Sequence, residues 1–184
     1  TDVIARAVCT PLSDILGKQI VIDNRAGAAG LIGTEIVAKA TPDGYTLLFG
    51  FSGPMSIAPH IVKSIPYDPV KDFAHVSLVA SAPYVLIANP ALPVMNVKEL
   101  VALARSQPGK LNFASGGTGT GIHMAGELLN HAAGIRIVHV PYKGAGPGMS
   151  ALIAGEVNVM FNGLSSALPH IKSHRLRALA VGGD

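Results

Sequence analysis

A short apolar run meets a loop rich in glycine and threonine in the stretch Leu111-Asn112-Phe113-Ala114-Ser115-Gly116-Gly117-Thr118-Gly119-Thr120-Gly121-Ile122-His123. The apolar residues 111–114 predict a buried strand, and residues 115–121 predict a tight loop. A helix is predicted over 122–133, because its apolar positions recur at helical spacing and Gly134 follows as a stop signal. A strand that passes through a short loop into a helix is typical of α/β folds.

The same alternation extends to both sides of this stretch. The pattern predicts strands over 19–23, 45–51, 73–81, 84–89, 135–140, 157–161 and 176–181. It predicts helices over 1–16, 31–39, 57–63, 97–106, 148–154 and 164–172, with Pro11 expected to kink or divide the first. The strands are continuous apolar runs, which favours largely parallel sheets covered by helices on both faces. In such folds ligands bind at the carboxyl ends of the strands.

The loop 115–121 has the composition of an anion-binding site. Its glycines allow close backbone approach, and its successive N–H groups can point at one centre. The N-terminus of the following helix adds a partial positive charge that favours a carboxylate or phosphate. Ser115, Thr118 and Thr120 offer hydroxyl groups. A tight turn without a ligand is the alternative, and His123 in the first helical turn suits either a structural role or a ligand contact.

A dinucleotide site matches this loop only weakly. The glycines Gly117, Gly119 and Gly121 are followed by Ile122 where the dinucleotide motif has a further glycine. The next predicted strand runs into Pro141-Tyr142-Lys143, without the acidic residue that holds a ribose. Lys143 is either a partner for a ligand carboxylate or a solvated surface lysine.

Composition excludes several other classes of function. The 184 residues are 49% hydrophobic and 14% charged, with a net charge of +3 and 5% aromatic residues. Without clustered cations and stacking rings, nucleic-acid binding is not expected. The single Cys9 excludes an internal disulfide and a cysteine zinc cluster. No G-x-S-x-G motif or close carboxylate pair marks a catalytic site. His170 and His174 lack the glutamate of the H-E-x-x-H motif, so we expect no metal there.

Several longer motifs occur in one order along the chain. They are Val21-Ile22-Asp23-Asn24-Arg25-Ala26-Gly27-Ala28-Ala29-Gly30, Pro42-Asp43-Gly44-Tyr45, Tyr67-Asp68-Pro69-Val70-Lys71-Asp72-Phe73, Ala114-Ser115-Gly116 with Thr120 and His123, Val140-Pro141-Tyr142-Lys143-Gly144, and Arg175-Leu176-Arg177-Ala178-Leu179-Ala180-Val181. In these motifs the chain resembles the Bug-type, TctC-like substrate-binding proteins of tripartite tricarboxylate transporters.

The resemblance implies an α/β fold of the periplasmic-binding-protein type II kind, with two lobes joined by crossover strands. Residues 1–82 correspond to lobe 1, and residues 83–184 to lobe 2, which ends at the return crossover. Family members begin with a further strand and loop before Asp2 and continue beyond Val181, so lobe 1 is expected to be incomplete and the chain truncated at both ends. The signal peptide of a periplasmic protein is not in this chain.

The resemblance also implies a function. Such receptors are not enzymes: each captures a small carboxylate (a di- or tricarboxylate, an amino acid or an aromatic acid) and delivers it to the membrane subunits of the transporter. The full-length protein is expected to be a monomer without a cofactor. Backbone amides and small hydroxyl side chains hold the ligand. The candidate ligand-binding residues are Thr1, Asp2, Ser52 and Gly53 in lobe 1, and Ser115, Gly116, Thr118, Gly119, Thr120, His123, Tyr142, Lys143 and Asn162 in lobe 2.

Two alternatives remain beside the receptor. One is a nucleotide-binding α/β enzyme that uses the loop 115–121. The other is a non-functional fragment whose apolar edges are satisfied by self-association.

Overall fold

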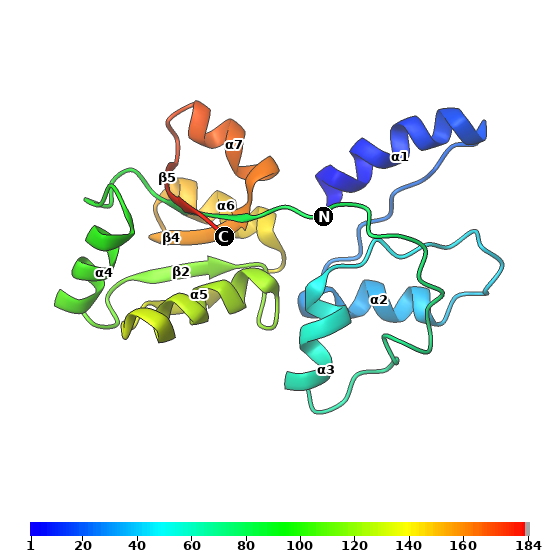
Figure 1. The fold of residues 1–184 in the computed structure, drawn as a ribbon, viewed down its shortest axis with the longest axis horizontal. Helices are drawn as coiled ribbons and strands as arrows, with labels where there is room; N and C mark the ends of the chain where they lie inside the picture. Colours follow the sequence, from blue (N-terminus) through cyan, green and yellow to red (C-terminus); the bar gives the residue numbers. More distant parts are fainter. Residues whose placement is uncertain (183–184) are drawn as a thin grey trace. The chain divides into compact units, whose positions relative to one another are not determined.

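The computed structural model describes residues 1–182, which form two compact units, one from Thr1 to Ser81 and one that begins at Ala82. The second unit contains a five-stranded sheet in the order β3-β2-β4-β1-β5 (Figure 1). The strands are β1 (Tyr84–Ala88), β2 (Asn112–Ser115), β3 (Val138–Pro141), β4 (Val159–Gly163) and β5 (Arg177–Val181). The helices of this unit are α4 (Val97–Ser106), α5 (Gly121–Ala133), α6 (Ala145–Ala154) and α7 (Leu164–Lys172).

The sheet is mixed, whereas the apolar runs favoured a largely parallel sheet. Strand β2 runs parallel to β3 and β4, but β1 is antiparallel to both of its neighbours, β4 and β5. At the far end of the β1–β5 pair, the Gly182 amide donates to the Tyr84 carbonyl at 2.7 Å. An apolar run indicates that both faces of a strand are buried, but it carries no information about the direction of that strand.

Both faces of the sheet are buried. Val85 and Ile87 of β1 pack with residues of α6 and α7, whereas Leu86 and Ala88 pack with residues of α4. Successive side chains of a strand point to opposite faces, so this alternation places a helical layer on each side of the sheet. The unit is therefore a helix–sheet–helix sandwich.

The regular elements described in the first unit are helical. It contains α1 (Asp2–Leu16), the 3-10 turn η1 (Ala28–Gly30), α2 (Leu31–Ala38), the π-helical segment η2 (Gly53–Ile57) and α3 (Ala58–Ile61). Helix α1 continues through Pro11, which does not divide it, and ends at Gly17 in the left-handed conformation. The Tyr67 hydroxyl, which is buried, donates to the Pro54 carbonyl at 2.8 Å.

The strands predicted over 19–23, 45–51 and 73–81 are wrong for this structure. These segments form no strand among the described residues. Several of their apolar side chains lie open to solvent: Tyr45 is 92% exposed and Val76 is 85% exposed. A β-strand needs a neighbour to receive its backbone hydrogen bonds, and no described segment supplies one.

Candidate functional site

Three helices begin at one edge of the sheet in the second unit. Strands β2, β3 and β4 are mutually parallel, so their carboxyl ends lie at the same edge, and α5, α6 and α7 follow from these ends (Figure 1). The first N–H groups of a helix lack acceptors within the helix and carry a partial positive charge of about half an elementary charge. Three such termini make this edge favourable for an anion.

The loop 115–121 lies against the start of α6. The Tyr142 amide donates to the Ser115 carbonyl at 3.1 Å, and the Gly144 amide donates to the Gly116 carbonyl at 3.2 Å. A Cβ atom added at Gly116 would lie 3.1 Å from the amide nitrogen of Ala145. This close backbone approach favours glycine at position 116, and its hydrogen bonds connect the ends of β2 and β3.

Hydroxyl groups hold the loop in shape. The Thr120 hydroxyl donates to the Gly117 carbonyl at 2.8 Å and accepts the His123 amide at 3.3 Å, as the N-cap of α5. The Ser115 hydroxyl, which is fully buried, accepts the Gly117 amide at 3.1 Å. Gly117 and Gly119 have φ values of +125° and +88°, which favour glycine. Ser115 and Thr120 thus act within the loop through hydroxyls that already have partners.

Other groups of the loop have donors to spare. The amides of Gly116, Thr118, Gly121 and Ile122 donate to no acceptor among residues 1–182. The Thr118 side chain is exposed, and its hydroxyl makes no hydrogen bond to the described part of the chain. These groups are the ones that remain available for an anion.

Asn162 adds a side-chain donor at the end of β4. The residue is only 5% exposed, and its Oδ1 accepts the Gly163 amide at 2.8 Å. Its Nδ2 has no acceptor within residues 1–182. Every fully buried side-chain nitrogen or oxygen in that range has a partner, so Nδ2 is not fully buried. The amide nitrogen therefore reaches solvent from an otherwise buried side chain, which is the arrangement expected of a ligand contact.

Two histidines support the loop from behind. The Gly119 amide donates to Nδ1 of His123 at 3.2 Å, and Nε2 of His139 lies 2.6 Å from the Ser115 hydroxyl. Burial lowers the pKa of His139 to about 4, with a smaller contribution from the neighbouring His123. Burial also lowers the pKa of His123, while Glu127 opposes this shift. His139 was not predicted from the sequence, because its contact with Ser115 depends on the register of β2 and β3, in which His139 lies opposite Phe113.

The remaining sequence candidates lie in different places. Tyr142 and Lys143 follow β3, where Tyr142 is partly buried against the core and Lys143 is exposed. Thr1 and Asp2 begin α1 in the first unit, and the Asp2 carboxylate accepts hydrogen bonds from Arg6 at 3.0 Å and Asn24 at 2.6 Å, which lower its pKa. In the same unit, Ser52 is exposed and Gly53 is buried at the start of η2. The structure brings only the second-unit candidates to one edge of one sheet.

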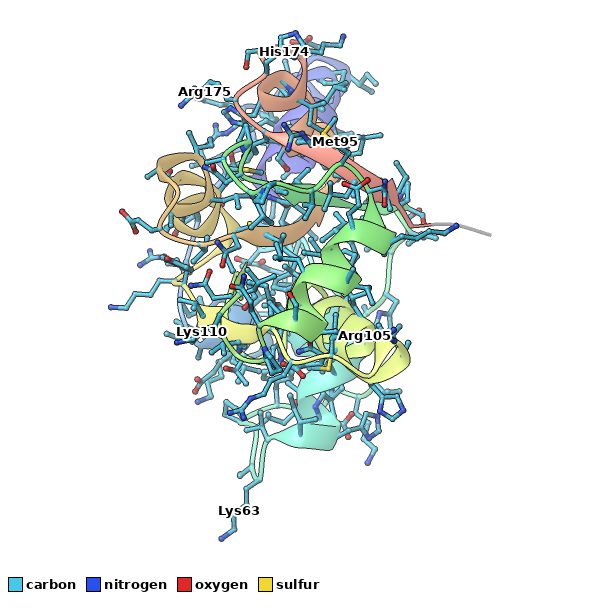
Figure 2. The ribbon with its side chains drawn as sticks, turned by 90° about the vertical axis from the view of Figure 1, so that its left-hand side faces the viewer. Lys63, Met95, Arg105, Lys110, His174 and Arg175 are labelled. Carbon is cyan, nitrogen blue, oxygen red and sulfur yellow. The ribbon has the colours of Figure 1, made fainter. Side chains whose placement is uncertain are left out.

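Positive charge is concentrated in the second unit. Residues 82–182 contain eight Lys and Arg residues and three Glu residues, whereas residues 1–81 contain six and seven acidic residues. Lys110 and Arg175 precede β2 and β5, and Arg105, in the last turn of α4, donates to the Ala133 carbonyl at 2.7 Å, so these three cations do not follow the carboxyl ends of the strands (Figure 2). The surplus favours approach of an anion through the field of the whole unit rather than through direct pairing.

The structure offers little to a metal ion. No group of three or more His, Cys, Asp or Glu side chains suited to metal binding occurs in residues 1–182. His174 lies beyond the end of α7 with φ +56°, so it does not share a helical face with His170. None of the helices described here is both long and apolar enough to span a bilayer.

Comparison with known proteins identifies the family. The family described as the tripartite tricarboxylate transporter family receptor, TctC, matches residues 4–184, and the chain belongs to this family. The chain is 40% identical to BugT of Bordetella pertussis over 182 residues and 41% identical over 180 residues to a Pseudomonas sp. protein from the tcbD-tcbE intergenic region. The Bug-type, TctC-like prediction is confirmed. The alignments cover 98% of this chain but 56% and 53% of those relatives, so the chain spans about half their length.

Solved structures agree with this assignment. The structure described as a periplasmic transporter matches all of this chain with a TM-score of 0.97 at 39% identity, and 61% of that chain is covered. R. palustris Rpa4515 with adipate matches 98% of this chain and 60% of its own, with a TM-score of 0.96 at 35% identity. MatC from Rhodopseudomonas palustris with bound malate has a TM-score of 0.92 at 31% identity, over 100% of this chain and 62% of its own. The α/β fold of periplasmic binding proteins is confirmed.

Proposed function

We propose that this chain is part of a periplasmic receptor that binds a small carboxylate at the carboxyl edge of the sheet in the second unit. The free amides of the loop 115–121, at the start of α5, are the observation that carries this proposal. A carboxylate offers several lone pairs and suits a set of converging N–H donors. The adipate and malate found with two family members support a carboxylate as the ligand.

Individual groups take separate roles in this proposal. The amides of Gly116, Thr118, Gly121 and Ile122 donate hydrogen bonds to the carboxylate, and the Thr118 hydroxyl adds a further donor. Asn162 donates through Nδ2 from the end of β4. Ser115 and Thr120 shape the loop, because their hydroxyls already have partners within it.

The whole protein carries further proposals. We infer that the two compact units correspond to the two lobes, 1–82 and 83–184, and that Thr1, Asp2, Ser52 and Gly53 contribute ligand contacts in the complete receptor. For Asp2 the contact would come from the backbone, since its carboxylate is already paired and would repel an anion. The receptor would be a monomer, would not be an enzyme, and would deliver its ligand to the membrane subunits of a tripartite transporter.

A substitution at Asn162 tests the site directly. Asn162→Asp keeps the oxygen that accepts the Gly163 amide and replaces the free donor with a negative charge. Calorimetric titration with malate, adipate and citrate should show binding to the unaltered chain and none to this variant. Gln107→Glu introduces the same charge change at an exposed position beyond the end of α4 and should bind as the unaltered chain does.

A second pair of variants separates the ligand contact from the fold. Thr118→Val removes an exposed, unpaired hydroxyl and should weaken binding by roughly fivefold, the value of about one hydrogen bond. Thr41→Val, at an exposed position in the first unit, should change neither affinity nor stability. Equal affinity in folded Thr118→Val and Asn162→Asp variants would refute this site. Binding of NAD without any response to carboxylates would favour the nucleotide enzyme instead.

A further inference from the structure

Three rings stack behind the loop 115–121. The ring centroids of His123 and His139 are 4.0 Å apart, and those of His139 and Phe113 are 5.0 Å apart. Phe113 is 2% exposed and belongs to the core between α4 and the sheet. The two imidazoles are thus fixed against a rigid side chain, and each one contacts a polar group of the loop.

The contact to Gly119 specifies the protonation of His123. A backbone N–H can only donate, so Nδ1 of His123 must carry a lone pair. In the neutral ring the proton then resides on Nε2, which lies 3.9 Å from Oε1 of Glu127. Addition of a second proton would place an N–H on Nδ1 directly opposite the Gly119 N–H. Two donors cannot bond each other, so protonation removes this support from the loop.

His139 is constrained by burial and by its neighbours. Its Nε2 contacts the Ser115 hydroxyl, which is fully buried and also accepts the Gly117 amide. Among the described residues, the titratable groups that act on this ring are His123 and Glu127. Because the two imidazoles are in contact, a charge on one opposes a charge on the other.

We propose that His139 and His123 are positioning residues that hold the loop 115–121, His139 through Ser115 and His123 through Gly119, and that the Gly119 contact persists only while the His123 ring is neutral. The effect on the loop stands on the contacts above. Its consequence for carboxylate affinity rests on the proposed function. The low pKa of His139 and the lowered pKa of His123 agree with rings that stay neutral near pH 7.

Nuclear magnetic resonance on the chain, labelled with ¹⁵N, tests the proposal without any ligand. At pH 7 the spectrum should show His123 protonated at Nε2 alone. On acidification, the Gly119 and Gly117 amide resonances should shift with the same midpoints as the His123 and His139 rings. The protection factor of the Gly119 amide, which compares its exchange with that of an unstructured amide at the same pH, should fall by roughly tenfold across that transition, because one hydrogen bond is lost. Loop resonances that stay constant while the rings titrate would overturn the proposal.

Variants of His123 distinguish positioning from simple packing. In His123→Asn, Oδ1 can accept the Gly119 amide but cannot take up a proton, so the amide should stay protected at both pH 7 and pH 4.5. In His123→Leu, the amide should exchange rapidly at both values. His131→Asn alters an exposed histidine in the last turn of the same helix and should behave as the unaltered chain does. Equal Gly119 protection in the Asn and Leu variants would refute the assigned contact.

Carboxylate affinity of the same variants separates the positioning role from the proposed function. With malate as the probe at pH 7, His123→Leu should bind at least about fivefold more weakly than His123→Asn. If the loop responds to pH as expected but neither the unaltered chain nor any variant binds a carboxylate, the proposed function fails while the positioning role stands. If carboxylates bind equally well to both variants, the positioning role fails while the function stands.

Discussion

Gly126→Ala should destabilise the second unit although alanine is the better helix former. Gly126 is buried on the face of α5 that packs against β2. A Cβ atom at this position would lie 2.3 Å, 2.6 Å and 2.7 Å from three ring atoms of Phe113. The ring cannot move away easily, because it is 2% exposed and stacks against His139.

The expected free energy follows from two opposing terms. Replacing glycine by alanine within a helix is worth about 1 kcal/mol in favour of the folded state. Overpacking of a tight core typically costs about 1–3 kcal/mol. The added Cβ atom overlaps a confined ring, so we expect a cost at the upper end of this range, about 3 kcal/mol. The net loss is about 2 kcal/mol. Gly146→Ala in α6 is the matched control, because nothing lies within 4 Å of its added Cβ atom and it should be neutral or stabilise by up to about 1 kcal/mol.

Native-state hydrogen exchange is the suitable assay, because it reports the opening free energy of β2 and α5 separately from the first unit. For the most protected amides of these elements, the opening free energy should fall by about 2 kcal/mol in Gly126→Ala and should not fall in Gly146→Ala. Adding Phe113→Leu to Gly126→Ala should cost less than the sum of the two single changes, since the smaller side chain relieves the overlap. Equal or greater stability of Gly126→Ala, or strictly additive effects, would refute the assigned packing.

Three other predictions concern acid, a side-chain clamp and the first unit. Unfolded His139 takes up a proton near pH 6.5, but the folded form does so only at its pKa of about 4, so the unfolding free energy should fall as the pH drops through this window. The full difference of about 3 kcal/mol is reduced by solvent screening to about 1–2 kcal/mol, and denaturant titrations of His139→Phe should show a flatter pH dependence. Asn130→Ala should cost about 1–3 kcal/mol, measured by the same titrations at pH 7, because Asn130 bonds both the N–H and the C=O of Ile137 at 3.0 Å and 2.9 Å; a loss below 0.5 kcal/mol would contradict the role of this clamp. Amides of 45–51 and 73–81 should exchange roughly a hundredfold faster than those of β1, and comparable protection would show that these segments do form a ladder.

Local pattern was sufficient for the second unit. Helices over 97–106 and 164–172 occur as predicted, and each strand of the unit lies within three residues of its predicted start. The reason is physical: helix caps, glycine stops and apolar periodicity act over a few residues, so a short stretch of sequence contains them in full. The loop 115–121 was found for the same reason, since its glycines mark a backbone shape that other residues rarely adopt.

Tertiary structure decided everything that depends on distant partners. The apolar runs over 45–51 and 73–81 resemble strands, but a strand exists only where another strand bonds to it. The antiparallel direction of β1 follows from its pairing with β4 and β5 and leaves no mark in its own five residues. Likewise, the pairing of the Ser115 hydroxyl with Gly117 and His139 is visible only in the fold, and its contact with a ligand stays a prediction.

The sequence by itself thus determined the α/β class, the elements of the second unit, the position of the loop 115–121 and the family. Only the tertiary structure showed which donors in that loop remain free, and that His139 stands behind them. Ser115 and His139 are 24 residues apart in the chain and meet only because β2 and β3 pair in parallel. Such a contact depends on strand register, and register is a property of two segments together rather than of either one alone.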